Sequence, residues 1–452
     1  MRACKTVVNR GRITKATLTN QQRGPGFALP EVTVVNLWCR DSFTTSDWTM
    51  ATFGVARVQN VSRRARLIGL VLAALISGIY ATWFAQRPLY NWDMIPYVAI
   101  ALLDAGQPAD TLREKTYDII KESTPVERHE FLLGGSNYKK DTYIRGADYR
   151  YMVARDSKIF ANQLPFYTVK PVYPALMSLF VRAGVNPVTA TMVISGAAYA
   201  AICLLLYVWI SRWLNPAISL VITALLSLNP ILTPLAQLAT PDALSVFVLL
   251  LGTFFVFETK FLRSGIGIFI ASILIRPENI IYAFIFLGFL AAIRKLPLTS
   301  CAIGLCVAFG IYFAETRLSQ NYGWSTLFYF TFIDWRILEG APASSLGLSD
   351  YAHIYAKEVF RLVFSRGAAF PVFALAGFGA LLLKFDRLQP WRDPCLQLVF
   401  LAAVYAAART AALPGEPDRA LAFPYMLIAI ALIHACAFIK TSDKADLIQR
   451  YQ

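Results

Sequence analysis

Long apolar blocks, separated by short basic or polar joints, run through most of the chain. Stretches such as "LIGLVLAALISGIYATWF" and "VTATMVISGAAYAAICLLLYVWI" are apolar on every side, as expected of helices that face lipid. A soluble protein of this length would show amphipathic helices instead. Because 56% of the residues are hydrophobic and only 16% are charged, the pattern predicts an all-α integral membrane protein.

We expect about ten transmembrane helices. The candidate spans are residues 67–84, 188–210, 216–236, 240–258, 264–275, 279–293, 298–316, 368–383, 396–412 and 420–438. Basic residues fall on alternate joints between these spans, and the positive-inside bias then places both termini in the cytoplasm. The spans define a transmembrane domain over residues 67–438. A basic, partly disordered cytoplasmic tail (1–66) precedes it, and a short cytoplasmic tail (439–452) follows.

The net charge of +15 is concentrated near the N-terminus, where residues 1–66 carry 11 Lys/Arg against 3 Asp/Glu. A basic tail could bind nucleic acid. Because the arginines of "SRRAR" directly precede the first span, the positive-inside bias explains the charge better, and we expect membrane lipid and no nucleic acid as partner. Met50 begins a stretch typical of a membrane-protein start, so residues 1–49 are expected to be a dispensable extension.

Two large loops, residues 85–187 and 317–367, fall on the outer side in this topology. The segment "PVYPALMSLF" (171–180) is too short to cross about 30 Å of hydrocarbon, so the first loop is expected to contain interfacial helices. Residues 264–293 are interpreted as two short helices that meet at "RPEN", which suits a water-filled cavity. Function is expected in these loops and in the cavity beneath them.

Signatures of soluble enzymes are absent: there is no GxSxG, P-loop, GxGxxG after a strand, or HExxH. The three histidines are scattered and the seven cysteines form no CxxC pair, so no metal site is predicted. A cofactor is not expected, and a divalent ion is compatible with the sequence without being indicated by it. Any catalysis must depend on carboxylates and cationic side chains.

Asp93 follows the first span within about three helical turns and would face the headgroup of a lipid-borne substrate. A carboxylate there can act as general base. The alternative is an N-cap, because Asp followed by "MIPYVAIALL" is an ordinary helix start, and the two roles are compatible. Asp104 immediately precedes "AGQP", where we expect a solvated helix end.

Four cations fall at the same predicted depth on the outer side: Lys170, Arg276, Arg409 and Arg419. Each has a simpler explanation, since Lys170 could snorkel to headgroups and Arg276 could pair with Glu278. As a set they favour binding of a phosphate or diphosphate.

Three carboxylates complete the candidate substrate-binding residues: Glu278, Asp242 and Asp418. Asp242 lies at the mouth of a span, where capping by Thr240 with Pro241 in the first turn is the alternative. Asp418 directly precedes Arg419. The aromatic stretch "NYGWSTLFYFTFIDWRIL" (321–338) is expected to form an interfacial belt, with a sugar- or lipid-stacking surface as the alternative.

The order of these motifs resembles the GT-C glycosyltransferases, and within them the protein mannosyltransferase and aminoarabinose transferase branch. "YNWDMIPYVAIALLDAG" resembles the family's catalytic acidic motif, although a single Asp stands where the family often has two acidic residues. "KPVYPALMSLFVRAG" resembles its Lys-Pro-Pro-Leu segment, and "DRALAFPYMLIAIAL" its Arg-Tyr-x-x-Pro segment. "TPDALSVFVLLLG" and "ILIRPEN" are similar to the corresponding spans. The likeness runs through most of residues 67–438 as short stretches.

The resemblance implies a membrane glycosyltransferase that moves a sugar from a polyprenyl-phosphate donor to a lipid, glycan or protein acceptor, with inversion. Asp93 would be the base, and Lys170, Arg276 and Arg419 would hold the phosphate. The expected location is the plasma (inner) membrane, with the active site on the extracytoplasmic face.

Two alternatives remain open. A transporter or flippase of lipid-linked sugars would also need a basic cavity and broken helices, but not Asp93. A structural membrane protein would bind no lipid phosphate through Lys170 or Arg276.

Overall fold

The computed structural model describes residues 62–134, 146–339, 347–364, 379, 393–414 and 417–450, with no strand among them. The predicted N-terminal tail lies outside these residues up to position 61, and so does the predicted span 368–383 except for one residue. Within the described part, the prediction of an all-α fold is confirmed.

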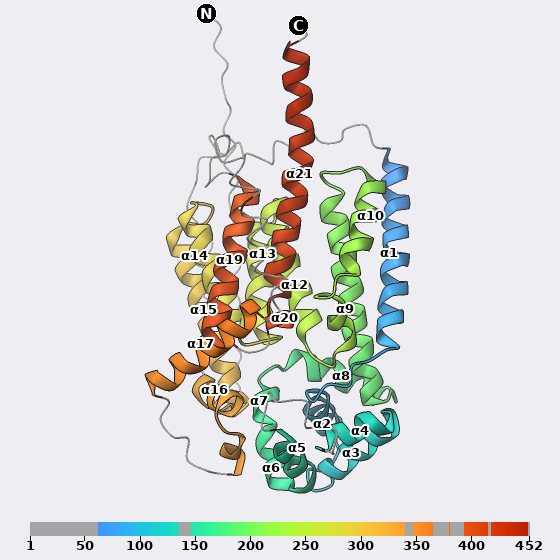
Figure 1. The fold of residues 1–452 in the computed structure, drawn as a ribbon, viewed down its shortest axis with the longest axis vertical. Helices are drawn as coiled ribbons and strands as arrows, with labels where there is room; N and C mark the ends of the chain where they lie inside the picture. The colour runs from blue at the N-terminus through green and yellow to red at the C-terminus, as the bar shows by residue number, and fades with distance from the viewer. Residues whose placement is uncertain are drawn as a thin grey trace, which may run out of the picture. The chain divides into compact units, whose positions relative to one another are not determined.

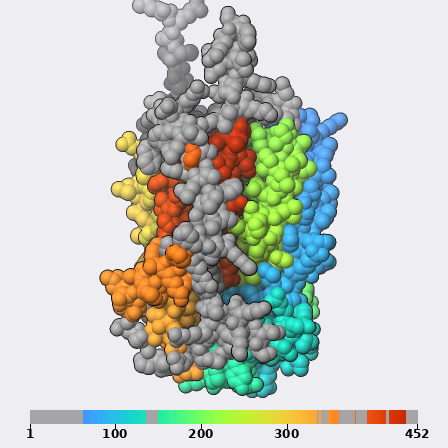
Figure 2. Space-filling model, in the orientation of Figure 1, coloured from blue at the N-terminus to red at the C-terminus, as the bar shows by residue number. Residues whose placement is uncertain are grey.

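Four helices in the described part are long and apolar enough to cross a membrane: α1 (Arg63–Ala85), α9 (Pro187–Ile210), α15 (Leu298–Leu318) and α19 (Pro394–Ala412). All four fall on predicted spans, so the chain is a helical membrane protein. Much of α1 and α15 is exposed, and α1 (blue) lies at the surface in Figure 2. A surface of exposed apolar side chains is expected where a helix faces lipid.

Close helix packing depends on small residues. The buried positions of α1 are Gly69, Ala73, Ser77 and Ala81, which form one stripe at a spacing of four residues against α9. A methyl group at Gly69 would collide with the Tyr207 ring of α9. Such small-residue stripes let apolar helices approach closely where no hydrophobic effect drives them together.

The predicted span 216–236 is not one continuous helix. α10 (Pro216–Ser227) ends early, and α11 (Thr233–Gln237) is a separate short helix. Pro230 has no amide hydrogen and disfavours a helical residue before it. The side chain of that preceding residue, Asn229, instead accepts from the Ile231 amide at 2.9 Å.

The predicted break at "RPEN" is confirmed. α13 (Leu262–Ala271) continues into one 3-10 turn, η2 (Ser272–Leu274), and α14 begins at Asn279 and ends at Ala292. Buried Asn279 closes the break by donating to Ser245 Oγ at 2.8 Å and to Ser272 O at 2.9 Å. Ser245 belongs to α12 (Asp242–Glu258), so the break is tied to the start of that helix.

The last helix, α21 (Ala422–Arg450), passes without interruption from the predicted span 420–438 into the predicted C-terminal tail. It packs along α19 in the described part of the chain. A four-residue helix, α20 (Pro417–Ala420), directly precedes it.

The first loop folds into a group of helices at one end of the bundle (Figure 1). These are α2 (Met94–Asp104), α3 (Leu112–Ser123), α4 (Val126–Leu132), α5 (Gly146–Arg155), α6 (Ser157–Gln163), α7 (Pro165–Thr168) and α8 (Val172–Arg182). They share a hydrophobic core separate from that of the long helices. Every residue of α2 from Met94 to Leu102 is buried, so α2 is a core helix of this loop. The segment expected to be interfacial, residues 171–180, lies largely in α8, which has both buried and exposed residues.

The second loop contributes α16 (Trp324–Phe332), η3 (Trp335–Glu339) and α17 (Leu348–Phe364). Its aromatic residues pack inward against the first loop: Phe330 stacks on Phe166 with ring centroids 5.0 Å apart, and Tyr322 lies 5.2 Å from the same ring. This aromatic stretch therefore joins the two loops, while Tyr322 and Trp324 remain exposed, and the interfacial belt stays a prediction.

Candidate functional site

Asp93 occupies the N-cap position of α2, but its side chain makes no capping hydrogen bond. The carboxylate instead accepts from Tyr167 Oη at 3.1 Å through Oδ1, and from Asn91 Nδ2 at 3.1 Å and Arg419 Nη1 at 2.8 Å through Oδ2. The capping interpretation of this side chain is therefore wrong. Asp93 is held by residues from three separate parts of the chain.

The segment that carries Asp93 runs beside the segment that carries Asp242. The amide of Leu89 donates to Gln237 O at 3.1 Å, and Asn91 Oδ1 accepts from the Ala239 amide at 3.0 Å. Asn91 thus uses one end of its amide to hold Asp93 and the other to hold the neighbouring segment. The residue before it, Tyr90, adopts a left-handed φ of 43°, a conformation uncommon for a side chain of this size.

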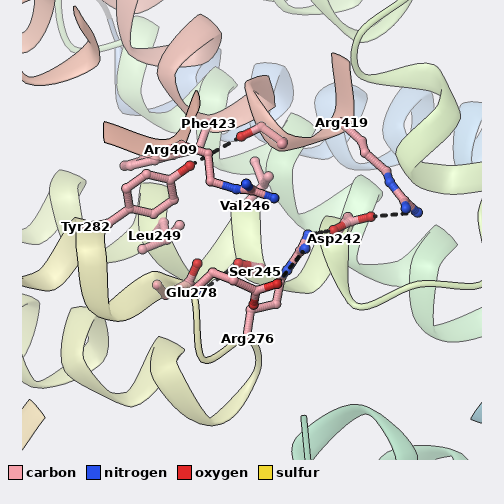
Figure 3. Close-up of a pocket in the computed structure, with 12 residues that line it drawn as sticks. Asp242, Ser245, Val246, Leu249, Arg276, Glu278, Tyr282, Arg409, Arg419 and Phe423 are labelled. Atoms are coloured by element: carbon pink, nitrogen blue, oxygen red, sulfur yellow. Dashed lines mark hydrogen bonds and ion pairs between the residues drawn. The ribbon is translucent and has the colours of Figure 1, made fainter. Parts of the chain in front are cut away.

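Asp242 is the centre of a chain of ion pairs. It is 2% exposed, and Arg276 and Arg419 reach it from different sides, the latter at 3.6 Å (Figure 3). Thr240 does not cap α12 as the sequence suggested; its hydroxyl donates to Asp242 Oδ2 at 2.8 Å, and Pro241 is the N-cap. The carboxylate draws the hydroxyl toward itself because a charged acceptor binds more strongly than a backbone group.

The chain of charges continues to the helix break. Arg276 pairs with Glu278 at 3.2 Å, which was one of the two alternatives left open by the sequence. Together with the Arg419 contact to Asp93, acids and bases then alternate along Asp93, Arg419, Asp242, Arg276 and Glu278. Arg276 is therefore neutralised within the protein, which weakens the interpretation that it points at an anionic ligand.

A pocket opens between α12, the break and the helices α19 to α21. Its volume is about 330 Å³, including its open mouth. Arg409, on the last turn of α19, lines it together with Arg276 and Arg419, and its guanidinium donates to Leu413 O at 3.1 Å. Tyr282 also lines the pocket, beside Arg409, and donates to Ala420 O at 3.2 Å (Figure 3).

Lys170 lies beside this network, immediately before α8. Its ammonium is 5.3 Å from the centroid of the Tyr167 ring and 5.9 Å from that of Tyr97. It interacts electrostatically with Glu278, Arg276 and Asp93, but makes no ion pair with a described side chain. Lys170 thus makes no ion pair with the described carboxylates, in contrast to Arg276 and Arg419.

The surroundings lower the pKa of both Asp93 and Lys170. Burial alone would raise the pKa of the Asp93 carboxyl, but Arg419, Lys170 and the Tyr167 hydroxyl outweigh it and hold the pKa below its usual value. Burial lowers the pKa of the Lys170 ammonium, and Arg276 and Arg419 add to this, against the pull of Glu278 and Asp93. Asp93 is therefore a firmly ionised carboxylate, while Lys170 is a cation in need of an anion.

The structure brings together Asp93, Asp242, Glu278 and all four predicted cations. The side chain of Asp418 lies outside the described residues. Asp104 ends α2 and is exposed, as predicted for a solvated helix end, and Arg182 donates to its backbone carbonyl. No group of three or more His, Cys, Asp or Glu residues able to hold a metal occurs in the described ranges.

Sequence reasoning missed Asn91, Tyr97 and Tyr167 as members of the site. A signal was present, since Asn91 lies two residues before Asp93 and Tyr167 three residues before Lys170. Comparison of the chain with family models, with curated proteins and with solved structures finds no match, so the site must be interpreted from its own geometry.

Proposed function

We propose that this protein is a membrane glycosyltransferase that moves a sugar from a polyprenyl-phosphate donor to an acceptor hydroxyl, with inversion. The observation that carries the proposal is the pairing of an ionised, partly exposed carboxylate with an ammonium that makes no ion pair with a described side chain. The first can remove a proton from a hydroxyl, and the second can bind the phosphate of the donor.

Asp93 has the hydrogen-bonding capacity that a general base needs. An ionised carboxylate has about four lone-pair sites. Asn91 and Arg419 use Oδ2, and Tyr167 uses one position on Oδ1, so a position on Oδ1 can still accept from an acceptor hydroxyl. The side chain is 22% exposed, so it is not fully enclosed by the protein.

Lys170 is better suited to bind a phosphate than Arg276 or Arg419. The guanidinium of Arg276 already pairs with Asp242 and Glu278, and Arg419 contacts Asp93 and Asp242. Binding of a phosphate to Lys170 breaks no such pair. The tyrosine rings beside Lys170 hold the ammonium in place through cation–π contact without neutralising it.

The reaction follows from these two groups. The acceptor oxygen forms a bond to the anomeric carbon from the face opposite the phosphate, and its proton passes to Asp93 Oδ1. The bond between the anomeric carbon and the phosphate oxygen breaks, and its electrons remain on the phosphate. Lys170 stabilises the charge that grows there, an interaction stronger in the transition state than in the ground state.

Asp93 is a weak base because its pKa is low, but this does not prevent catalysis. The hydroxyl becomes acidic only as its oxygen bonds to the anomeric carbon, so proton transfer is late. The low pKa ensures that the carboxylate is ionised before each turnover. The network of Arg419, Asp242 and Arg276 keeps it in place.

We also propose about ten spans, a location in the plasma (inner) membrane and an active site on the extracytoplasmic face. Alternation of basic joints along the chain supports this topology. The N-terminal end of α1 and the C-terminal end of α21 lie at the same end of the bundle, opposite the loops around Asp93 (Figure 1), as an even number of crossings requires.

The proposal is tested by purified protein in lipid nanodiscs with farnesyl-phosphate sugars and membrane extracts as acceptor source. The wild type should release farnesyl phosphate, and Asp93→Asn should bind the donor without releasing it. If Asp93→Asn retains release, the carboxylate is not the base. If donor moves between leaflets at equal rates in both proteins without cleavage, the protein is a transporter of lipid-linked sugars instead.

A further inference from the structure

Glu315 is an unexpected residue in the packing face of α15. The buried positions of this helix are Cys301, Gly304, Ala308 and Glu315, which follow one stripe. The first three are small, and α15 packs through this face against α14 and η2. A carboxyl group at the end of a stripe of small, uncharged residues requires a reason, because burying it without a hydrogen-bond partner is unfavourable.

No described residue donates a hydrogen bond to this carboxyl group or forms an ion pair with it. Glu315 is 6% exposed, and neither of its oxygens has a hydrogen-bond partner. It makes no ion pair with a described side chain. By contrast, buried Asp242 has a hydroxyl donor and two guanidinium partners.

The position of Glu315 connects it with the candidate site. It interacts electrostatically with Glu278, whose own Oε2 is buried and has no hydrogen-bond partner. The end of α15 is bound to the segment that carries Lys170, because Thr168 Oγ1 donates to Ser319 O at 3.3 Å. Glu315 lies one helical turn before Ser319, whose hydroxyl donates to the Glu315 carbonyl. The free acceptors therefore lie near the break and near the Lys170 segment.

We infer that Glu315, together with Glu278 Oε2, binds hydroxyl groups of the transferred sugar. This rests on the proposed function and assigns a subsite to it: Lys170 takes the phosphate, and three carboxylate oxygens without donors take the polyol. A carboxylate accepts two hydroxyls of a sugar at once through its two oxygens. A divalent ion fits less well, because such ions need about six oxygen ligands and the described residues offer no group of three ligand side chains.

The test compares two probes, farnesyl phosphate and farnesyl-phosphate mannose, glucose or arabinose, on protein in nanodiscs. Wild type should bind at least one sugar-bearing probe more tightly than farnesyl phosphate. Glu315→Gln should bind farnesyl phosphate as wild type does but lose about tenfold in affinity for that sugar-bearing probe. Glu258→Gln, a buried glutamate outside the site, is the matched control and should change neither affinity.

A second variant separates binding from folding. Glu315→Leu should likewise lose its higher affinity for the sugar-bearing probe over farnesyl phosphate. Its thermal midpoint should equal that of wild type or rise, because leucine has a similar volume to glutamate and needs no hydrogen-bond partner. The inference is overturned if no sugar strengthens wild-type binding, or if both variants keep that higher affinity. It is also overturned if Mg²⁺ or Mn²⁺ restores binding after EDTA treatment only when Glu315 is present. Failure of farnesyl phosphate itself to bind wild type would instead contradict the proposed function.

Discussion

Two buried glutamates of this protein have opposite surroundings. Glu258, at the end of α12 away from the candidate site, accepts from Trp209 Nε1 at 3.0 Å and pairs with Arg212 at 3.7 Å. The side chain of Glu258 is 4% exposed, and residue Glu315 is 6% exposed but has no donor for either oxygen. The first carboxylate joins two helices, whereas the second has binding capacity that the described protein does not use.

The same contrast applies to cations. Arg212 forms an ion pair with Glu258, and Arg276 forms ion pairs with Asp242 and Glu278. These pairs connect helices of the protein. Lys170 is surrounded by charges but has no ion pair of its own among the described side chains. Unsatisfied buried groups, and not charge alone, distinguish a site for a ligand from a structural ion pair.

Asp93→Asn should cause the largest loss of turnover. The amide keeps the shape of the side chain but cannot take a proton, so turnover should fall on the order of 10³-fold. Affinity for the donor should change much less. Release of farnesyl phosphate, measured by mass spectrometry over time, checks this, and an unchanged rate would remove Asp93 from the chemistry.

Asp242→Asn should have the largest effect on stability. It leaves the guanidinium of Arg276 facing a buried neutral group, which should lower the free energy of unfolding by about 3–5 kcal/mol. Equilibrium unfolding in mixed micelles measures the change. Thr240→Val, which removes only one hydroxyl donor to Asp242, is the control and should cost about 1 kcal/mol.

Lys170→Met should weaken binding of farnesyl phosphate by about 10- to 100-fold, because a charge-assisted contact is lost while the apolar stem is kept. Lys260→Met, at an exposed joint outside the candidate site, should leave the affinity unchanged. Equal affinities of wild type and Lys170→Met would place the phosphate elsewhere.

The pH dependence of donor binding tests Lys170 in a second way. Because the pKa of Lys170 lies below its usual value of 10.5, affinity for a farnesyl-phosphate sugar should fall as pH rises through that lowered value. The phosphodiester keeps one charge throughout, so the probe itself does not titrate. Lys170→Arg should retain affinity to higher pH. On the acid side, ionisation of Asp93 should persist below its usual pKa of 3.8.

Glu258→Gln should have the smallest effect. Arg212 is 43% exposed, so solvent screens the pair, and the glutamine carbonyl can still accept from Trp209. The free energy of unfolding should fall by less than about 1 kcal/mol with turnover unchanged. A large loss of turnover would show that the two ends of the protein are coupled.

Local signals made much of the fold predictable from the sequence. Long apolar blocks indicated the spans, and Pro277 between two charged residues in an apolar stretch indicated the break. The early end of α10 was missed, although Asn229 and Pro230 carried the signal. The burial of α2 was missed because it depends on contacts with other loop helices and not on its own pattern.

The candidate site was predictable only in its parts. The sequence placed Asp93, Arg276 and Arg419 at one depth, but not their partners, because Asp93 and Arg419 meet across 326 positions of the chain. The sequence alone therefore assigns the arginines to a phosphate, whereas the structure pairs Arg276 and Arg419 with carboxylates. Glu315 lies within an apolar helix, and only its packing distinguishes it from a solvated glutamate.

The central claim is that a lipid phosphate binds at Lys170 beside Asp93. Mass spectrometry of lipids that copurify with the protein from native membranes tests it most directly. A prenyl-phosphate sugar should copurify with wild type and with Asp93→Asn, and be strongly reduced in Lys170→Met. Absence of any prenyl phosphate from wild type, or equal amounts in all three proteins, would contradict the account.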